Sequence, residues 1–351
     1  MRIKNILIIT LTLLTSVAFS KTTPPQNSSQ KTPSSPEPTT YPSKKSSKSF
    51  HSDKCLYPAY SAPARIDVQA AWNFIVSASF IYWQPEMVGI DLGYVQSNDL
   101  STQAHSVVNF DSAYRPGFKV LLGTHYDYDN WNINARYTRY HAKEKDKNSK
   151  GDIIFHVFSD TVSITPLRSI WNPQIDYFDL EVGRPYYSGK HLVIKPYASV
   201  KGGWSKQKFR LNAQVSNEHQ EASFRTDSWF VGPRGALDIN WLLTHDFRIF
   251  LNSSVSLMYQ KFKTKDRFIS RFYNSLTFTT KFNAKSIQLT PAIDVNPGLG
   301  WSSYFDHNNW HIDLYAAYNF VYFFNQNEFL SVDTRGDFML HGFEGSLKFN
   351  F

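Results

Sequence analysis

The side chains able to bind ions or transfer protons in this sequence occur mainly as alternate residues of long segments. The segment "WNINARYTRYH" (131–141) is typical, since most of its even positions are polar and most of its odd positions up to 137 are apolar or aromatic. Side chains of a β-strand point alternately to the two faces of a sheet. The segment therefore predicts a two-faced strand whose polar face carries Arg136 between Asn134 and Thr138.

The same alternation along other segments collects a larger set of polar side chains on one face of a predicted sheet. Charges of opposite sign on neighbouring strands either hold a field across a water-filled pore or pair into a network that fills the interior. We expect pairing where Asp179 and Glu181 lie across a short turn from Lys195 and Lys201. The candidate lining residues are Lys119, Asn132, Asn134, Arg136, Asp179, Glu181, Lys195, Lys201, Arg234, Asp238, Arg248, Asp294, Asp313, Glu344 and Lys348.

Motifs for catalysis or for cofactor binding are absent from the sequence. It contains no HExxH, no Cys-x-x-Cys, no Gly-rich phosphate loop and no G-x-S-x-G elbow. The eleven histidines are scattered without metal-ligand spacing. We therefore predict no catalytic residue, no metal site and no cofactor, and we expect a protein that is not an enzyme. A Ser/His or Asp/His pair assembled from distant loops would leave no such motif.

The N-terminal part of the chain differs in composition from the rest. Residues 1–20 combine a basic start, an apolar run from Ile6 to Phe19 and small residues before Lys21, which is typical of a secretory signal peptide cleaved near Ser20. Residues 21–54 contain 26 Ser, Thr, Pro or Lys among 34 positions. This segment has little apolar surface to bury, so we expect a disordered arm that is a spacer or a tether to a partner.

Charge and cysteine content argue against a nucleic-acid-binding protein and against a fold stabilised by disulfides. The formal charge is +8, but from Cys55 onward 29 basic residues face 27 acidic ones. A nearly neutral folded part gives nucleic-acid binding little support. Cys55 is the only cysteine, so the exported chain has no intramolecular disulfide.

From about residue 70 to 351 the apolar signal has a period of two, and connections between the segments alternate in length. Short turns at 126–130, 185–190, 244–246 and 305–309 separate long connections at 84–116, 142–173, 205–227, 263–285 and 325–336. All long connections then leave one end of the sheet. The ten predicted strands are 72–83, 117–126, 131–141, 174–184, 191–204, 228–243, 247–262, 286–303, 310–324 and 337–351.

This arrangement fits a membrane barrel better than a soluble β-sandwich. Aromatic residues lie near the strand ends on the apolar face, as at Trp229 and Trp241. The opposite face carries charges of both signs, and the chain ends in an alternating strand with a terminal Phe351. We predict an all-β transmembrane antiparallel up-and-down barrel over 70–351, with short periplasmic turns and long extracellular loops. Ten strands are well supported, and β-rich pieces at 89–95, 152–158 and 209–215 raise the number to at most fourteen if they join the wall.

The sequence resembles the major-outer-membrane-protein-like family of Legionella and the environmental chlamydia-like bacteria. The resemblance lies in "FIYWQPEMVGIDLGYV", "RPGFKVLLGTHYDYDNWNINARYTRYH", "SIWNPQIDYFDLEVGRPYYSGKHLVIKPYASVKGG", "SWFVGPRGALDINWLL" and "LTPAIDVNPGLGW". It implies an integral barrel of the bacterial outer membrane that is thought to be a porin, and it supplies no catalytic or ligand residues. The Ser/Pro/Lys arm is unlike the usual start of this family.

Two functions are compatible with these expectations. The first, which is the leading hypothesis, is a passive pore for small hydrophilic solutes or ions, whose constriction is lined by the candidate residues above and by an inward-folded long loop (84–116 or 142–173). The second is a closed structural or adhesive barrel that acts through its surface loops, which a ten-stranded wall favours. Expected partners are outer-membrane lipids, the barrel insertion machinery through Phe351, solutes, and further copies of the chain as a homo-oligomer; nucleic acid is not expected.

Overall fold

The computed structural model describes residues 73–90, 94–96, 105–107, 110–126, 130–148, 153–155, 162–164, 167–215, 218–244, 246–272, 277–306, 309–329 and 336–351. All of these residues belong to one compact unit, Leu56–Phe351. The predicted signal peptide at 1–20, the arm at 21–54 and Cys55 lie outside the described residues. No helix in the described part of the chain is long and apolar enough to span a membrane.

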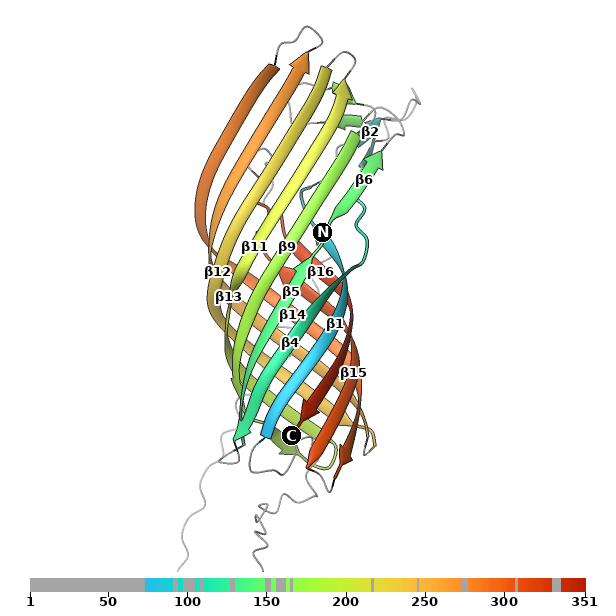
Figure 1. The fold of residues 1–351 in the computed structure, drawn as a ribbon, viewed down its shortest axis with the longest axis vertical. Helices are drawn as coiled ribbons and strands as arrows, with labels where there is room; N and C mark the ends of the chain where they lie inside the picture. The colour runs from blue at the N-terminus through green and yellow to red at the C-terminus, as the bar shows by residue number, and fades with distance from the viewer. Residues whose placement is uncertain are drawn as a thin grey trace, which may run out of the picture. The chain divides into compact units, whose positions relative to one another are not determined.

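Ten antiparallel strands form a closed barrel, as the period-two pattern predicts (Figure 1). Around the barrel the order is β11-β12-β13-β14-β15-β16-β1-β4-β5-β9, and β9 pairs with β11 to close it. The wall strands are β1 (Asn73–Met87), β4 (Arg115–Tyr126), β5 (Trp131–His141), β9 (Leu167–Gly183), β11 (Leu192–Val215), β12 (Glu218–Leu242), β13 (Phe247–Phe272), β14 (Thr277–Phe305), β15 (Trp310–Phe323) and β16 (Phe338–Asn350).

The remaining strands are short and do not enlarge the barrel. A separate four-stranded sheet joins the two long connections that follow β1 and β5. The β-rich pieces at 89–95 and 152–158 thus contribute to this small sheet, so the wall keeps ten strands. The short strands are β2 (Tyr94–Gln96), β3 (His105–Val107), β6 (Glu144–Asn148), β7 (Ile153–Phe155), β8 (Val162–Ile164) and β10 (Tyr186–Ser188); β6 pairs with β9, and β10 pairs with β11.

The first and last strands meet to close the wall at the end of the barrel that carries the short turns. The register of β1 and β16 runs from Ile75 opposite Asn350 to Met87 opposite Phe338. Two backbone hydrogen bonds beyond it join Phe74 and Phe351, with N···O distances of 2.7 and 3.0 Å. The Phe351 ring stacks on Trp310 at 5.6 Å between centroids. The terminal residue is therefore part of the wall as well as the end of the chain.

Side chains alternate between an exposed apolar face and a buried polar face along the wall strands. On β5, Trp131 and Ile133 are exposed while Asn132 and Asn134 are buried. On β12, Trp229 and Trp241 are exposed and lie at the two ends of an apolar stretch. Twelve residues of strand rise about 40 Å, which a tilt of about 40° reduces to roughly 30 Å across the membrane. The apolar face thus has the height of a hydrocarbon layer and faces lipid.

Five strands, β9 and β11–β14, continue well beyond this apolar band, which corrects the predicted connections at 205–227 and 263–285 and the end of the one at 142–173. β11 and β12 remain paired up to Val215 and Glu218, and β13 and β14 up to Arg271 and Thr277. These strands form the yellow-to-orange extension at the upper end of the barrel in Figure 1. Many outward positions here are charged, so the sequence analysis predicts solvated loops, although the inward positions become largely apolar, as at Phe209 and Leu211.

Candidate functional site: the interior of the barrel

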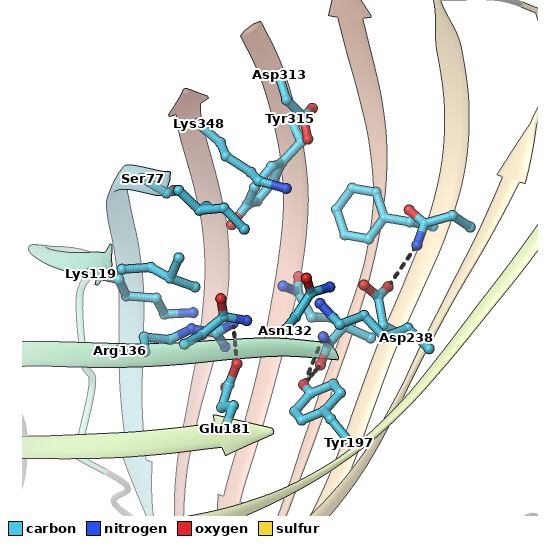
Figure 2. A pocket seen from close by; sticks show the side chains of 18 of the residues that line it. Ser77, Lys119, Asn132, Arg136, Glu181, Tyr197, Asp238, Asp313, Tyr315 and Lys348 are labelled. Carbon is cyan, nitrogen blue, oxygen red and sulfur yellow. Dashed lines mark hydrogen bonds and ion pairs between the residues drawn. The ribbon is translucent and has the colours of Figure 1, made fainter. Parts of the chain in front are cut away.

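All fifteen candidate lining residues lie on the inward-facing side of the wall. Eleven of them line a cavity of about 160 Å³ in the half of the barrel near the short turns, part of which Figure 2 shows. Asp179, Arg234 and Asp294 line a smaller space of about 30 Å³ next to it. Lys201 has no exposed side-chain surface and contacts Asp294.

The larger cavity is polar and holds charges of both signs. Arg248 binds both carboxylate oxygens of Asp313 at 2.9 and 2.7 Å, linking β13 to β15. In Figure 2 Lys348 and Asp238 project into the same space from other strands. Asn240 donates a hydrogen bond to Asp238 at 3.1 Å. A cavity of this size and polarity has room for several water molecules.

A layer of ion pairs crosses the middle of the barrel. Arg234 on β12 binds Glu181 on β9 at 2.9 Å and lies 3.6 Å from Asp294 on β14. Lys201 on β11 binds Asp294 on β14 at 3.1 Å, with two strands, β12 and β13, between them. Because these pairs join strands that are not neighbours, the side chains extend across the interior instead of lying along the wall. The space beside these ion pairs has a volume of about 30 Å³, whereas the cavity nearer the short turns has about 160 Å³.

A second group of charges completes this layer on the other side of the barrel. Lys119 on β4 binds Glu344 on β16 at 2.6 Å and donates to Asn319 on β15 at 2.8 Å. The Tyr315 hydroxyl donates to the same Glu344 carboxylate at 2.9 Å. Arg136 on β5 approaches Glu181 at 3.4 Å (Figure 2). The buried Glu344 carboxylate thus has a charged donor and a neutral donor, as a buried charge requires.

Asp179 and Glu181, on β9, were predicted to form ion pairs with lysines of β11, and the ion pairs observed here have other partners. Asp179 lies opposite Lys201 in the strand register, yet Lys201 reaches Asp294. Glu181 binds Arg234 and Arg136. For Lys201 the predicted partner is wrong, because strand spacing identifies neighbours within the wall, whereas a long side chain in a narrow barrel reaches across it.

Above the ion pairs, the interior becomes aromatic. Trp83, Tyr140 and Trp171 are fully buried. The Tyr140 hydroxyl donates to the Trp83 carbonyl at 2.9 Å, and Trp171 packs edge-on against Phe338 at 6.0 Å between centroids. Opposite Trp83, Gly342 has a φ of 148°, a conformation that L side chains rarely adopt. This cluster occupies the cross-section of the barrel on the extracellular side of the charges.

Residues from two long connections complete the cluster from within. Phe329, from the segment between β15 and β16, is buried and stacks on Phe209 and near Phe224, at 6.3 and 5.6 Å between centroids. Gln326 and Gln260 are joined by side-chain hydrogen bonds of 3.1 and 2.9 Å. Phe110, from the connection between β1 and β4, contacts Trp171 and Phe209. The inward-folded segments are therefore 324–329 and the part of 84–116 around Phe110.

The sequence interpretation missed this aromatic cluster, although the alternation contained a signal for it. Phe338 and Leu340 share their parity with Glu344, and Phe209 shares its parity with Lys201. The sequence analysis predicts an inward face that is polar throughout, and this prediction leaves large apolar residues with inward parity out of the interior. Their concentration toward one end of several strands indicates a change of lining from polar to aromatic.

The described residues contain no group of three or more His, Cys, Asp or Glu side chains that could hold a metal ion.

Three solved structures align with most of this chain. The TodX deltaS2S3 mutant monoaromatic hydrocarbon channel is 10% identical, with a TM-score of 0.34, and the alignment covers 83% of this chain and 93% of that one. The outer membrane protease OmpT of Escherichia coli is 11% identical, with a TM-score of 0.35 and coverages of 80% and 98%. The attachment invasion locus protein Ail of Yersinia pestis is 8% identical, with a TM-score of 0.23 and coverages of 80% and 99%.

A comparison with curated proteins gives no match. The family described as "Legionella pneumophila major outer membrane protein precursor" matches residues 67–351, which include every strand of the barrel. The chain therefore belongs to the Legionella major outer membrane protein family and is a β-barrel of the bacterial outer membrane.

Proposed function

We propose that this protein is a closed outer-membrane barrel that acts through its extracellular surface. The observation that carries the proposal is the filled cross-section of the interior, where ion pairs join non-neighbouring strands below a fully buried aromatic cluster. The proposal includes no catalytic step.

The number of strands supports the same interpretation. A barrel's diameter grows with its strand number, and small barrels are filled by their own side chains. Lys201 and Trp171, from the charged layer and the aromatic cluster, have no exposed surface. A hydrated solute crossing the barrel would have to separate buried ion pairs and also displace packed aromatic rings. Each of these steps costs several kcal/mol.

A passive pore for small hydrophilic solutes is the second candidate, and one specific observation favours it. The cavity of about 160 Å³ carries both signs of charge and extends through the half of the barrel near the short turns. Withdrawal of segment 324–329 would remove Phe329 and Gln326 from the interior. The charged layer would then be the constriction, and Arg136 and Arg234 would influence ion selectivity.

A liposome swelling assay separates the two candidates. The full chain is refolded into phosphatidylcholine vesicles, and osmotic swelling is followed with neutral sugars of increasing size. Neutral solutes are chosen because the charges of the interior do not repel them. We expect swelling at the rate of vesicles without protein. Swelling that is faster and falls with sugar size, from vesicles whose protein shows the heat-modifiable folded band, would support the pore and contradict the closed barrel.

A further inference from the structure

A basic surface lies on the outward face of the strand extension formed by β11–β14. In the register of these strands, three successive outward rows contain twelve positions, of which nine are Lys or Arg and one, Asp227, is acidic. We call these positions the basic face. Its rows are Lys206–Asp227–Lys263–Lys285, Lys208–Arg225–Lys265–Asn283 and Arg210–Ser223–Arg267–Lys281.

The basic face begins where the lipid-facing surface ends. Trp204 and Trp229 are opposite each other and exposed, and Tyr259 packs against Trp229 at 5.8 Å between centroids. Such exposed aromatic rings mark the membrane interface. Lys206 is the next outward residue after Trp204, about 7 Å farther along the strand. The head-group region of a bilayer is roughly 5 to 8 Å thick on each side. The first row therefore lies at head-group depth, and the next two rows lie above it.

Opposite charges within the protein do not balance this surface. Among the described ion pairs, Arg225 is the member of the face with an acidic partner, Asp227, at 2.8 Å. Arg225 itself stands between Lys208 and Lys265, and Lys263 stands opposite Lys285. Like charges directly opposite each other on neighbouring strands destabilise a sheet. An anion bound across the rows would remove this repulsion.

We propose that the basic face binds the phosphate groups of a phosphorylated glycolipid of the lipid A type in the outer leaflet. Arg and Lys side chains bind phosphate through charge-assisted hydrogen bonds. Adjacent outward residues of neighbouring strands lie about 5 Å apart, so one phosphate can contact two or three cations. A lipid whose phosphates and sugars extend above the acyl chains also reaches the upper rows. The proposal holds whether the interior conducts or not.

The location favours a lipid over a soluble polyanion. The rows continue the lipid-facing surface of the same four strands, and they cover one side of the barrel. On the other side, the corresponding outward positions above the aromatic residues include Gln84, Glu86 and His341. A soluble acidic polymer would not require cations at the level of the bilayer surface.

The test is a lipid titration of the refolded full chain in neutral detergent micelles, followed by native mass spectrometry. The lipids are bisphosphorylated lipid A, lipid A without phosphates, and phosphatidylglycerol. The variant Lys263→Gln/Lys265→Gln removes two central charges, and the matched control Lys263→Arg/Lys265→Arg keeps them. A second control, Lys190→Gln, removes an exposed charge from a turn at the other end of the barrel. The heat-modifiable gel band confirms that each variant is folded.

Wild type should bind bisphosphorylated lipid A more tightly than either other lipid. Each cation near a membrane surface contributes about fivefold, so the Gln variant should bind roughly 25-fold more weakly. The Arg variant and Lys190→Gln should bind as wild type does. Equal binding by the Gln variant, equal binding of lipid A without phosphates, or equal binding of phosphatidylglycerol would each overturn the proposal. Heparin that displaces lipid A at equal charge concentration would instead assign the face to a soluble polyanion.

Discussion

At the scale of single residues, the buried charges are structural in the closed barrel that we propose. Arg234 is central, because its guanidinium group contacts Glu181, Asp179 and Asp294 within 3.7 Å and donates to the Ser254 hydroxyl at 2.9 Å. Removing one partner from a buried pair leaves an uncompensated charge, which costs more than the pair contributed.

We therefore predict that Arg234→Met destabilises the folded barrel by about 3 to 5 kcal/mol. The measurement is reversible urea unfolding in lipid vesicles, followed by tryptophan fluorescence. The matched control is Arg267→Gln, which removes an exposed charge and should change stability by less than about 1 kcal/mol. Equal effects of the two substitutions would mean that Arg234 is hydrated in a wide lumen.

Phe351 combines a structural position with a predicted role in recognition by the insertion machinery. Its backbone is hydrogen-bonded to Phe74 and its ring stacks on Trp310, but the residue remains 40% exposed. We expect Phe351→Ser to refold in vesicles almost as well as wild type and to lose most of its assembly in cells. The readout is the fraction of protein in the heat-modifiable form in each setting.

The control for recognition is Phe343→Ser, on the outward face of the same strand and 61% exposed. It should assemble in cells better than Phe351→Ser does. If both variants assemble equally in cells, the terminal position has no special role.

At the scale of the strands, the outward face of β13 changes from apolar to basic beyond Tyr259 while the strand itself continues. Leu257 is exposed in the apolar part and Lys265 in the basic part. Spin labels report this change directly, after Cys55→Ser removes the native thiol. We predict that a label at Leu257→Cys collides mainly with oxygen, as in lipid, and one at Lys265→Cys mainly with a water-soluble nickel chelate. A label at Lys265→Cys that is buried in lipid would contradict the position of the membrane boundary.

The strands also show which parts of the fold could be predicted from sequence. Alternation identified the wall strands and their two faces, because lipid and the polar interior select opposite residue types on β5 and β16. It failed above the membrane on β11–β14, where water replaces lipid outside and aromatic residues replace charges inside. Between Lys206 and Asn212 the alternation therefore continues, but polar side chains now face outward and apolar ones inward. The sequence analysis predicts a loop there because this is the reverse of the pattern in the membrane.

The partners of the interior charges were not predictable for a different reason. Parity places Lys201 and Asp294 on the inner face, but their contact spans two intervening strands. Such contacts depend on the barrel's diameter and on the stagger of its strands, and neither quantity follows from the pattern within any one strand. The burial of Phe329 was also not predictable, since its segment has no period-two pattern that would assign side chains to the interior.

At the scale of the whole molecule, the central claim is that the barrel is closed by its own side chains. Three successive layers fill it from the short-turn end: a small polar cavity, a layer of ion pairs, and an aromatic cluster completed by Phe329 and Phe110. In this account the extracellular strand extension is the part of the molecule that meets other molecules.

Single-channel recording of the refolded full chain in a planar bilayer tests this claim most directly. We predict that wild type gives no step-like conductance, and that Asn327→Gly/Phe329→Gly, which weakens the inward-folded segment, gives brief openings at most. The heat-modifiable band of the same preparation shows that folded barrels were inserted. Regular, long-lived conductance steps from wild type would contradict the closed barrel and establish a pore.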